Sequence, residues 1–309
     1  MGKVAFVFPG QGSQVVGMGK AVHDQVDAAR AVFEAADAAL GEPLSRLCFE
    51  GPLDQLKLTA NTQPALLTTS IALLRALDER PDVVAGHSLG EYSANVAAGA
   101  LAFERAVRLV RTRGTYMQEA VPVGQGAMAA VLGGDPNAIQ DVLRQVPGVV
   151  EPVNYNSPGQ IVIAGEASAV ETAKPLLVAL GCKVMPLPVS APFHSSLMQP
   201  AEERLTPHLL DTPFAATEVP VYVNVDAAPV RDGDALRDAL VRQVSRSVRW
   251  QESVQRLAGD GVTLCVEIGP GKVLAGLIKR IDAKLKSVNV QGPDDLEPAR
   301  AAIREARAN

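Results

Sequence analysis

The order of apolar and polar positions predicts two strand–loop–helix units in the first hundred residues. Residues 3–8 form an apolar run that stops at a glycine-rich loop, and residues 82–85 form a second run that stops in the same way. A helix is predicted after each loop, and another over residues 64–77, with Pro64 in its first position. Strands that alternate with helices favour a parallel sheet, so we expect an α/β fold.

The middle of the chain has a different pattern, in which helices alternate with pairs of short strands. The predicted order is strand, helix, strand, strand, helix, strand, over residues 127–132, 136–145, 149–155, 160–164, 167–180 and 183–187. This βαββαβ order is typical of a ferredoxin-like unit. We therefore expect a small inserted domain over residues 121–198, within a larger α/β domain made of residues 1–120 and 199–309. The larger domain is predicted to continue with elements over residues 201–210, 221–225, 234–245 and 263–268 and with a helix after residue 271.

Composition and charge narrow the class of protein. The net charge of −5 gives no overall attraction to nucleic acid or to an anionic membrane. Apolar runs stay well short of the ~20 residues that a membrane-spanning helix needs, and the first residues lack the pattern of a secretion signal. The sequence therefore predicts a soluble, cytoplasmic protein.

The cysteines support the same compartment. Cys48, Cys182 and Cys265 are widely spaced and match no metal site. We expect them to be reduced thiols, and packing as small buried hydrophobes accounts for each of them. No metal is predicted.

Residues 86–90, Gly-His-Ser-Leu-Gly, match the G-x-S-x-G pattern of a nucleophilic serine. The pattern follows a predicted strand and precedes a predicted helix, which is the context that such a turn requires. The turn would expose the hydroxyl of Ser88, and the amide of Leu89 at the helix start would form half of an oxyanion hole. Glycine-rich turns also produce this pattern by chance, and the five residues alone leave that alternative open.

A serine hydroxyl needs a general base near neutral pH, and histidine is the usual one. Of the four histidines, His23 and His208 fall on predicted helices, and His87 adjoins the serine, so its side chain is expected to point away from the hydroxyl. His194 lies in an irregular segment around Pro192, near the expected domain junction. It is the best candidate for the base, although a purely structural role in the loop stays open.

An α/β-hydrolase carries an acid between its serine and its histidine along the chain. Here the acids between Ser88 and His194, such as Asp135 and Asp141, fall in the expected small domain. Helix capping accounts for Asp135, and a solvated helix face accounts for Asp141. The sequence therefore favours a Ser–His dyad whose imidazole is oriented by something other than a carboxylate.

The helix predicted over residues 103–120 carries an arginine within its apolar stripe. Helical spacing places Phe103, Ala106, Val110, Arg113 and Met117 on one face. A buried guanidinium is costly unless it is paired, and no acid lies on a neighbouring turn of that face. Arg113 is a candidate clamp for a substrate carboxylate. An ion pair with a distant acid of the fold is the alternative, and periodicity does not decide between the two.

Seven segments, in the same order, resemble the family of malonyl-CoA:acyl carrier protein transacylases and the related acyltransferase domains of polyketide synthases. They are FPGQGSQ at residues 8–14, NTQPAL at 61–66, GHSLGEYSA at 86–94, RGTYMQEAVP at 113–122, NYNSPGQIVIAG at 154–165, APFHSSLM at 191–198 and EIGPGKVL at 267–274. The similarity covers nearly the whole chain. It implies a hydrolase-like α/β core with a ferredoxin-like insertion and an active site between them.

The resemblance also implies roles for individual residues. Ser88 would be the nucleophile and His194 its base. The amide of Gln11 would join that of Leu89 in the oxyanion hole. Arg113 would bind the malonyl carboxylate, which favours the clamp over the structural ion pair.

Three further expectations come from the resemblance. Phe193, beside the base, would crowd the α-carbon and disfavour a methylmalonyl group, although plain packing also accounts for it. The family orients its histidine with a backbone carbonyl near residues 248–250, which we assign to Arg249. The family's carrier protein is acidic, and a run of basic residues near the C-terminal helix is a candidate docking patch, in which Lys284 and Lys286 are the residues to test; a solvated face is the usual account of such a run. The run consists of Lys272, Lys279, Arg280, Lys284 and Lys286.

The reaction implied is transfer of a malonyl group from malonyl-CoA to the phosphopantetheine thiol of acyl carrier protein, in fatty acid biosynthesis. It would pass through a malonyl ester on Ser88 with ping-pong kinetics and would need no bound cofactor. The alternatives are an acyltransferase for another extender unit of polyketide synthesis, a thioesterase or esterase on the same serine, and a non-catalytic scaffold that binds the carrier protein.

Overall fold

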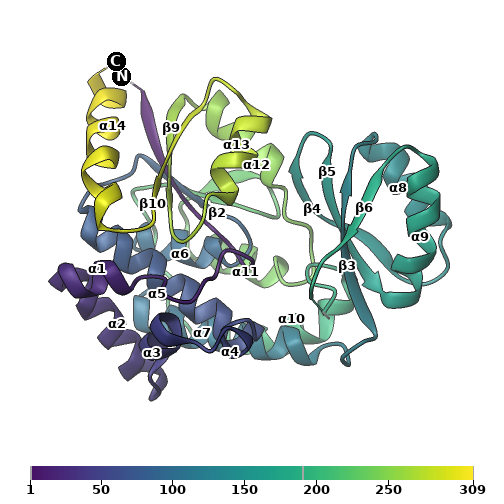
Figure 1. Cartoon of the computed structure of the whole chain (residues 1–309), viewed down its shortest axis with the longest axis horizontal. Helices are drawn as coiled ribbons and strands as arrows, with labels where there is room; N and C mark the ends of the chain where they lie inside the picture. The colour runs from purple at the N-terminus through teal and green to yellow at the C-terminus, as the bar shows by residue number, and fades with distance from the viewer. Residues whose placement is uncertain (1, 190, 309) are drawn as a thin grey trace.

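The computed structural model describes residues 2–189 and 191–308, which form a larger and a smaller part (Figure 1). Ser190, in the segment predicted to carry the base, lies outside the described residues. The larger part is built on a six-stranded sheet of order β10-β9-β1-β2-β7-β8, and the smaller part on a four-stranded sheet of order β4-β5-β3-β6. The predicted fold class is confirmed, because an α/β core is combined with a ferredoxin-like unit.

The strands of the large sheet are parallel except at one edge. They are β1 (Lys3–Phe8), β2 (Val83–Gly86), β7 (Val221–Val223), β8 (Ala228–Val230), β9 (Val262–Ile268) and β10 (Lys286–Val290). Strand β8 pairs with β7 in antiparallel register, and the other pairs are parallel. The carboxyl ends of the five parallel strands therefore meet at one edge of the sheet, where ligands of open α/β sheets usually bind.

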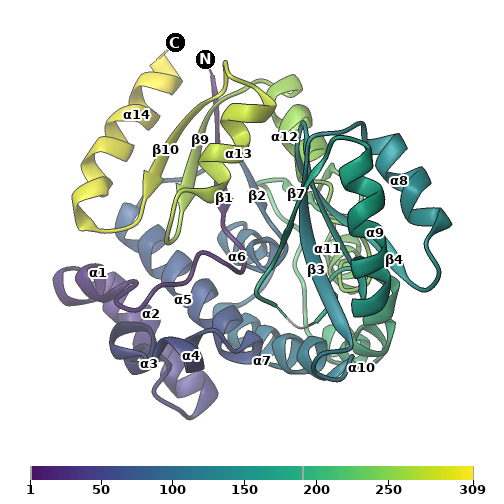
Figure 2. The same ribbon diagram turned by 45° about the vertical axis from the view of Figure 1, so that its right-hand side comes forward.

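Helices cover both faces of the large sheet (Figure 2). They are α1 (Lys20–Gln25), α2 (Asp27–Leu40), α3 (Leu44–Glu50), α4 (Leu53–Leu56), α5 (Thr59–Leu77), α6 (Gly90–Ala97), α7 (Phe103–Glu119), α10 (Gln199–Leu210), α11 (Gly233–Arg242), α12 (Trp250–Gly259), α13 (Val273–Ile281) and α14 (Leu296–Ala308), with short 3₁₀ turns η1 (Ser196–Met198) and η2 (Pro293–Asp295). The start of β1 lies beside the end of α14, and the amide of Gly2 donates to the carbonyl of Ala306 at 3.1 Å.

The central strand β1 is buried on both sides, as its uninterrupted apolar sequence requires. Val4, Phe6 and Phe8 face the core that contains α2, α5, α7 and α14. Ala5 and Val7 face a second core, formed with α12 and α13. The alternation fixes the register of β1, because a slip of one residue would exchange the two sets of side chains.

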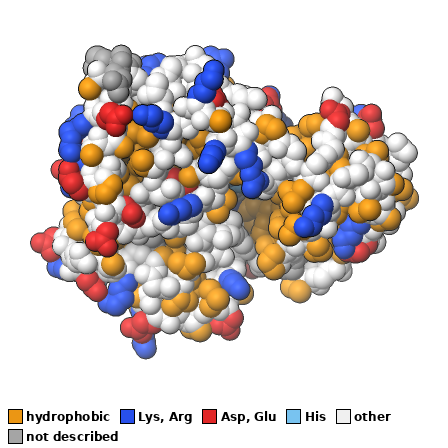
Figure 3. Space-filling view, turned by 45° about the horizontal axis from the view of Figure 1, so that its top comes forward, with side chains coloured by type: hydrophobic (Ala, Val, Ile, Leu, Met, Phe, Trp, Pro, Cys, Tyr) orange, Lys and Arg blue, Asp and Glu red, His pale blue; other side chains and the backbone are white. Residues whose placement is uncertain are grey.

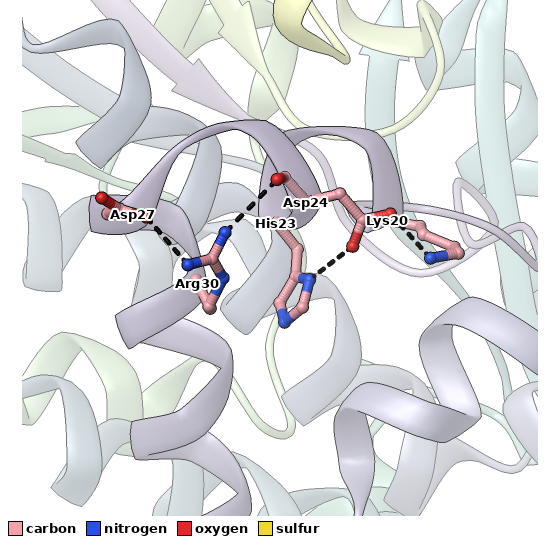
Figure 4. Close-up of polar contacts among 5 residues, drawn as sticks. All are labelled: Lys20, His23, Asp24, Asp27 and Arg30. Carbon is pink, nitrogen blue, oxygen red and sulfur yellow. Dashed lines mark hydrogen bonds and ion pairs between the residues drawn. The ribbon is translucent and has the colours of Figure 1, made fainter.

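Charged side chains at the surface tie α1 to the start of α2 (Figure 4). Lys20 binds Asp24 at 2.7 Å, and the Nδ1 atom of His23 lies 2.8 Å from the same carboxylate. Arg30 binds Asp27 at 2.8 Å and donates to the Asp24 carbonyl at 3.3 Å. Exposed pairs of this kind contribute little to stability, because water and salt screen them. Arg30 thus links the two helices, and His23 has its polar contact with Asp24, away from the nucleophilic serine predicted at residue 88.

The smaller part has its own antiparallel sheet and its own core. Its elements are β3 (Gly126–Leu132), α8 (Pro136–Gln145), β4 (Val150–Ser157), β5 (Gln160–Glu166), α9 (Ala167–Ala179) and β6 (Lys183–Pro186). Both helices pack on one face of the sheet in a separate hydrophobic cluster. The six predicted elements are confirmed to within a few residues at each end.

Main-chain hydrogen bonds attach β4 to the larger part, and we call this contact the β4 junction. The Tyr155 amide donates to the Val248 carbonyl at 2.9 Å, and the Val248 amide donates to the Val153 carbonyl at 2.9 Å. Nearby, Glu151 accepts hydrogen bonds from the amide and hydroxyl of Ser196 at 2.7 and 2.8 Å. Backbone pairing and a carboxylate clamp therefore hold the two parts together.

Helix α5 begins earlier than predicted, at Thr59, so that Pro64 lies inside the helix. The carbonyl of Leu58 accepts from the amides of Asn61 and Thr62 at 2.8 Å each, which starts the helix before the proline. Gly114 of α7 packs against this extra turn, since a Cβ there would lie 2.6 Å from the Thr59 carbonyl oxygen. Tertiary packing extends the helix beyond what the proline signal indicates.

The single helix predicted after the first glycine-rich loop is four helices, α1 to α4, and β8, β10, α12 and α14 were not predicted. The predicted strand over residues 221–225 ends at Val223, where the chain turns into the edge hairpin with β8. Within the part of the chain that the structure describes, no helix is long and apolar enough to cross a membrane.

Candidate active site

Ser88 lies on a sharp turn between β2 and α6, at the carboxyl edge of the large sheet. Its φ of 52° is in the left-handed region, which is strained for a residue with a side chain. A Cβ on Gly86 would lie 1.9 Å from the backbone of Gly90, and a Cβ on Gly90 would lie 2.0 Å from the carbonyl oxygen of Phe8. Both glycines of the motif are therefore required by close backbone contacts.

A buried asparagine that the sequence analysis missed clamps this turn. The Oδ1 atom of Asn224 accepts from the Ser88 amide at 2.7 Å, and its Nδ2 atom donates to the Gly86 carbonyl at 2.7 Å. The side chain thus bridges the residues on either side of His87 and stabilises the left-handed serine. Asn224 follows β7 without a motif, so no signal in the sequence marked it.

The imidazole of His194 contacts the Ser88 hydroxyl directly, with 2.7 Å between Nε2 and Oγ. On the other side of the ring, Nδ1 donates to the backbone carbonyl of Gln243 at 2.8 Å. A protonated Nδ1 leaves Nε2 as the acceptor for the serine proton. Burial and the nearby charge of Arg113 lower the pKa of His194 to about 3, so the ring is neutral at neutral pH and able to act as a base.

The prediction that Arg249 orients the histidine is wrong. The carbonyl of Arg249 accepts from the amide of Ser253 at 3.0 Å and from its hydroxyl at 2.9 Å, because Arg249 caps the start of α12. Gln243 follows the last residue of α11, where terminal carbonyls have no partner within the helix. Its carbonyl is therefore available to the imidazole.

Neither of the acids considered in the sequence analysis contacts the base. Asp135 caps α8 by accepting from the amides of Asn137 and Ala138 at 2.9 and 3.1 Å. Asp141 pairs with Arg144 on the exposed face of the same helix at 2.9 Å. The dyad of Ser88 and His194 is thus oriented by a backbone carbonyl.

Arg113 is 1% exposed and reaches the same hydroxyl from another side. Its Nη2 atom lies 3.4 Å from Ser88 Oγ and 2.9 Å from the side-chain oxygen of Gln243. Its Nη1 atom donates to the side-chain oxygen of Gln63 at 2.8 Å, and Nε has no partner among the described residues. No carboxylate of residues 2–189 or 191–308 forms an ion pair with Arg113, so the structural alternative left open by the sequence is not observed.

Two backbone amides face the site without protein acceptors. Gln11 follows β1 and Leu89 precedes α6, and in the described chain neither amide donates a hydrogen bond to another backbone or side-chain atom. Both residues line the cavity that contains the Ser88 hydroxyl. Free amides at these positions are suited to binding an oxyanion.

The site opens into a cavity of about 320 Å³ between the two parts of the molecule, seen as a hollow in Figure 3. Apolar side chains from both parts line it, including Met128, Val162, Leu187 and Leu274. Phe193 also lines the cavity and is 8% exposed. The arrangement agrees with an active site between the core and the insertion.

His87 points away from the nucleophile, as the sequence predicted. Its Nε2 atom lies 2.8 Å from the side-chain oxygen of Asn156 on β4, and its ring packs against Trp250. Burial lowers the pKa of His87. The residue before the nucleophile therefore connects the turn to the smaller part.

The structure does not bring Lys284 and Lys286 to the cavity. Lys286 starts β10, and the strands beside it run in parallel toward the edge that carries the turn of Ser88. The two lysines therefore lie at the amino edge of the sheet, opposite the site. Lys286 binds Glu305 of α14 at 3.2 Å. Docking of the carrier protein on Lys284 and Lys286 stays a prediction, and their placement does not link them to the cavity.

A left-handed serine on a strand-to-helix turn, bound to a buried neutral histidine beside two free amides, defines a serine enzyme that transfers acyl groups. The chain belongs to the acyl transferase domain family, whose model matches residues 5–295. The resemblance drawn from the seven sequence segments is confirmed.

Named relatives cover the whole chain. It is 49% identical to the malonyl CoA-acyl carrier protein transacylase of Bacillus subtilis (strain 168), over 100% of both chains. The crystal structure of an acyl-carrier-protein S-malonyltransferase from Burkholderia pseudomallei 1710b is 50% identical, covers 96% of this chain and 99% of its own, and superposes with a TM-score of 0.93. A malonyl-transacylase solved in complex with a type II PKS acyl-carrier protein is 44% identical, with 97% and 99% coverage and a TM-score of 0.94.

Proposed function

We propose that this chain transfers a malonyl group from malonyl-CoA to the phosphopantetheine thiol of acyl carrier protein, in fatty acid biosynthesis. The observation that carries the proposal is that one hydroxyl, that of Ser88, lies 2.7 Å from a neutral imidazole and 3.4 Å from a buried guanidinium. A base activates the hydroxyl, and a cation beside it selects an acyl group that ends in a carboxylate. The names of the full-length relatives support the same reaction.

In the first half-reaction, His194 accepts the Ser88 proton as the hydroxyl oxygen attacks the thioester carbonyl. The amides of Gln11 and Leu89 stabilise the oxyanion, and Arg113 binds the malonyl carboxylate. Collapse of the tetrahedral intermediate breaks the carbon–sulfur bond, and the imidazolium returns its proton to the coenzyme A thiolate. The product is a malonyl ester on Ser88.

In the second half-reaction, the carrier-protein thiol enters the same cavity and gives its proton to His194 as its sulfur attacks the ester carbonyl. Collapse of the tetrahedral intermediate breaks the carbon–oxygen bond to Ser88, and the imidazolium returns the proton to the Ser88 oxygen. The steps use side chains and amides of the chain itself, so the proposal includes no cofactor. It also includes a cytoplasmic location, supported by three cysteines that are buried free thiols. A relative in complex with an acyl-carrier protein supports the partner.

Intact-mass measurement tests the proposal. Incubation of the purified chain with malonyl-CoA is expected to add one malonyl group to the protein, and added carrier protein should remove it as a thioester. Rapid release of the group to water, without transfer, would instead identify a thioesterase. Absence of any adduct would identify a non-catalytic scaffold.

The same measurement with methylmalonyl-CoA and acetyl-CoA shows which acyl groups the chain accepts. Phe193 adjoins the base and lines the cavity, and we propose that its ring occupies the space that an α-methyl group would need. Adduct formation should therefore be much slower with methylmalonyl-CoA. Equal labelling by both would favour an acyltransferase for another extender unit.

The carrier protein is proposed to contact the cavity mouth at two members of the predicted basic run, Lys272 just before α13 and Arg280 within that helix. Lys272 is exposed and directly precedes the lining residues of that helix, and Arg280 is exposed and donates to the side-chain oxygen of Gln160, another lining residue, at 2.7 Å. Lys and Arg side chains surround the hollow in Figure 3. An acidic partner would meet these cations as its arm enters the cavity.

Arg280→Glu is expected to raise the KM for carrier protein about fivefold or more and to leave the rate of labelling by malonyl-CoA unchanged. Lys286→Glu, at the opposite edge of the sheet, is the matched control and should change neither. Steady-state kinetics at low ionic strength measures both. If the two variants had the same KM for carrier protein, the α13 contact would be wrong.

A further inference from the structure

Glu91 is a fully buried carboxyl directly beneath the nucleophile, in the first turn of α6. Its Oε2 atom accepts from the Asn224 amide at 2.8 Å and from the side-chain Nε2 of Gln243 at 2.8 Å. Its Oε1 atom has no hydrogen-bond partner among the described residues. The reaction scheme above gives this carboxyl no role.

Gln243 connects Glu91 to each group around the hydroxyl. Its backbone carbonyl orients His194, its side-chain oxygen accepts from Arg113, and its Nε2 donates to the Ser88 carbonyl at 3.0 Å. One glutamine thus contacts the nucleophile, the base and the cation. The direction of its side-chain amide decides whether an oxygen or an N–H faces the guanidinium.

The Glu91 carboxyl favours one direction of that amide. In the observed direction, Nε2 donates to oxygens of Glu91, Ser88 and Asn224, and the side-chain oxygen faces a cation. In the flipped direction, the amide oxygen would face the carboxyl of Glu91 and the carbonyl of Ser88, while the N–H groups would face Arg113. This arrangement is costly in a buried site, because oxygen would face oxygen, N–H would face N–H, and none of these groups would have a hydrogen-bond partner.

Burial raises the pKa of Glu91 to about 7, against the lowering effects of its two hydrogen bonds and of the Arg113 charge. The carboxyl is therefore partly protonated at neutral pH, and the unpartnered Oε1 is the atom able to carry the proton. Oε2 remains an acceptor in both forms. A glutamine at this position would present the same acceptor.

We propose that Glu91 is a positioning residue, which sets the direction of the Gln243 side-chain amide and thereby holds Arg113 in place for the carboxylate of the acyl group. The inference rests on the proposed function, because it concerns recognition of malonyl. Since acetyl lacks the carboxylate, the ratio of kcat/KM for malonyl-CoA to that for acetyl-CoA isolates the effect on Arg113 from general damage to the turn.

Glu91→Ala is expected to lower this malonyl-to-acetyl ratio about tenfold or more, because it removes the carboxylate acceptor, which makes the shortest of the contacts that hold Gln243 Nε2 in the observed direction. Glu91→Gln keeps the acceptor, so its malonyl-to-acetyl ratio should stay within about threefold of the wild-type ratio. The readout is the rate of labelling by each thioester in intact-mass kinetics, with thermal melting as the check on folding. If Glu91→Ala does not fold, Glu91→Asp replaces it, since the shorter side chain withdraws the acceptor and should also lower the ratio.

Two results would overturn the inference. One is a folded Glu91→Ala or Glu91→Asp variant that keeps the ratio. The other is a Glu91→Gln variant that loses the ratio as fully as alanine, because charge rather than amide direction would then be responsible. Failure of the unchanged chain to form a malonyl adduct is a different outcome, which removes the proposed function itself.

Discussion

Ser88→Ala is expected to abolish the malonyl adduct and to lower malonyl transfer by about 10⁴-fold or more. The variant loses the hydroxyl oxygen that both the base and the cation contact, so the covalent intermediate cannot form. Alanine lacks just the hydroxyl, and the turn should persist because Asn224 binds the backbone amide of position 88 and the carbonyl of Gly86. Intact-mass measurement with malonyl-CoA and a steady-state assay of transfer both report the result.

Ser13→Ala is a suitable control for the loss of a hydroxyl. Ser13 lines the same cavity and is 7% exposed, yet its side chain contacts neither His194 nor Arg113. Its activity should stay within about threefold of the unchanged chain. A malonyl adduct on the Ser88→Ala variant would show that another residue is the nucleophile and would contradict the proposed mechanism.

Arg113→Ala is expected to lower kcat/KM for malonyl-CoA about 10²- to 10³-fold and to change kcat/KM for acetyl-CoA far less. Charge-assisted hydrogen bonds in a desolvated site are worth several kcal/mol in total. The guanidinium is held by two glutamine oxygens and one serine hydroxyl, which leaves its charge free for an incoming carboxylate. The malonyl-to-acetyl ratio is the quantity to measure.

Arg105→Ala, on the same helix but exposed, is the matched control and should leave the ratio unchanged. A truncated Arg113 also leaves Gln63 and Gln243 without their donor, so thermal melting should accompany the kinetics. An Arg113→Ala variant that still preferred malonyl would show that another group recognises the carboxylate.

Local motifs carried most of the successful predictions. The G-x-S-x-G motif predicted Ser88 on a strand-to-helix turn, because the turn requires glycines at fixed positions close to the serine in sequence. The apolar stripe predicted that Arg113 is buried, because helical period is a local property. The four-strand insertion was equally accessible, since its alternation of patterns extends over a continuous stretch of chain.

Contacts between distant residues could not be predicted in this way. Asn224, Glu91 and Gln243 act through a shared buried network, and neither spacing nor polarity distinguishes them from surface residues. The orienting carbonyl was misplaced at Arg249 because every residue has a carbonyl, and only the helix ends show which one is free. Lys284 and Lys286 are close to the C-terminal helix in sequence, but the direction of β10, which the sequence pattern does not give, places them at the edge of the sheet opposite Ser88.

The β4 junction holds the smaller part in place beside the active site. Because backbone pairing attaches the insertion at Val248, and because the Ser88 hydroxyl and the His194 imidazole are in contact, the reactive groups are assembled without a hinge movement. We therefore expect the cavity to stay open throughout turnover. The order of events would then be set by which pantetheine arm occupies it, that of the donor or that of the acceptor.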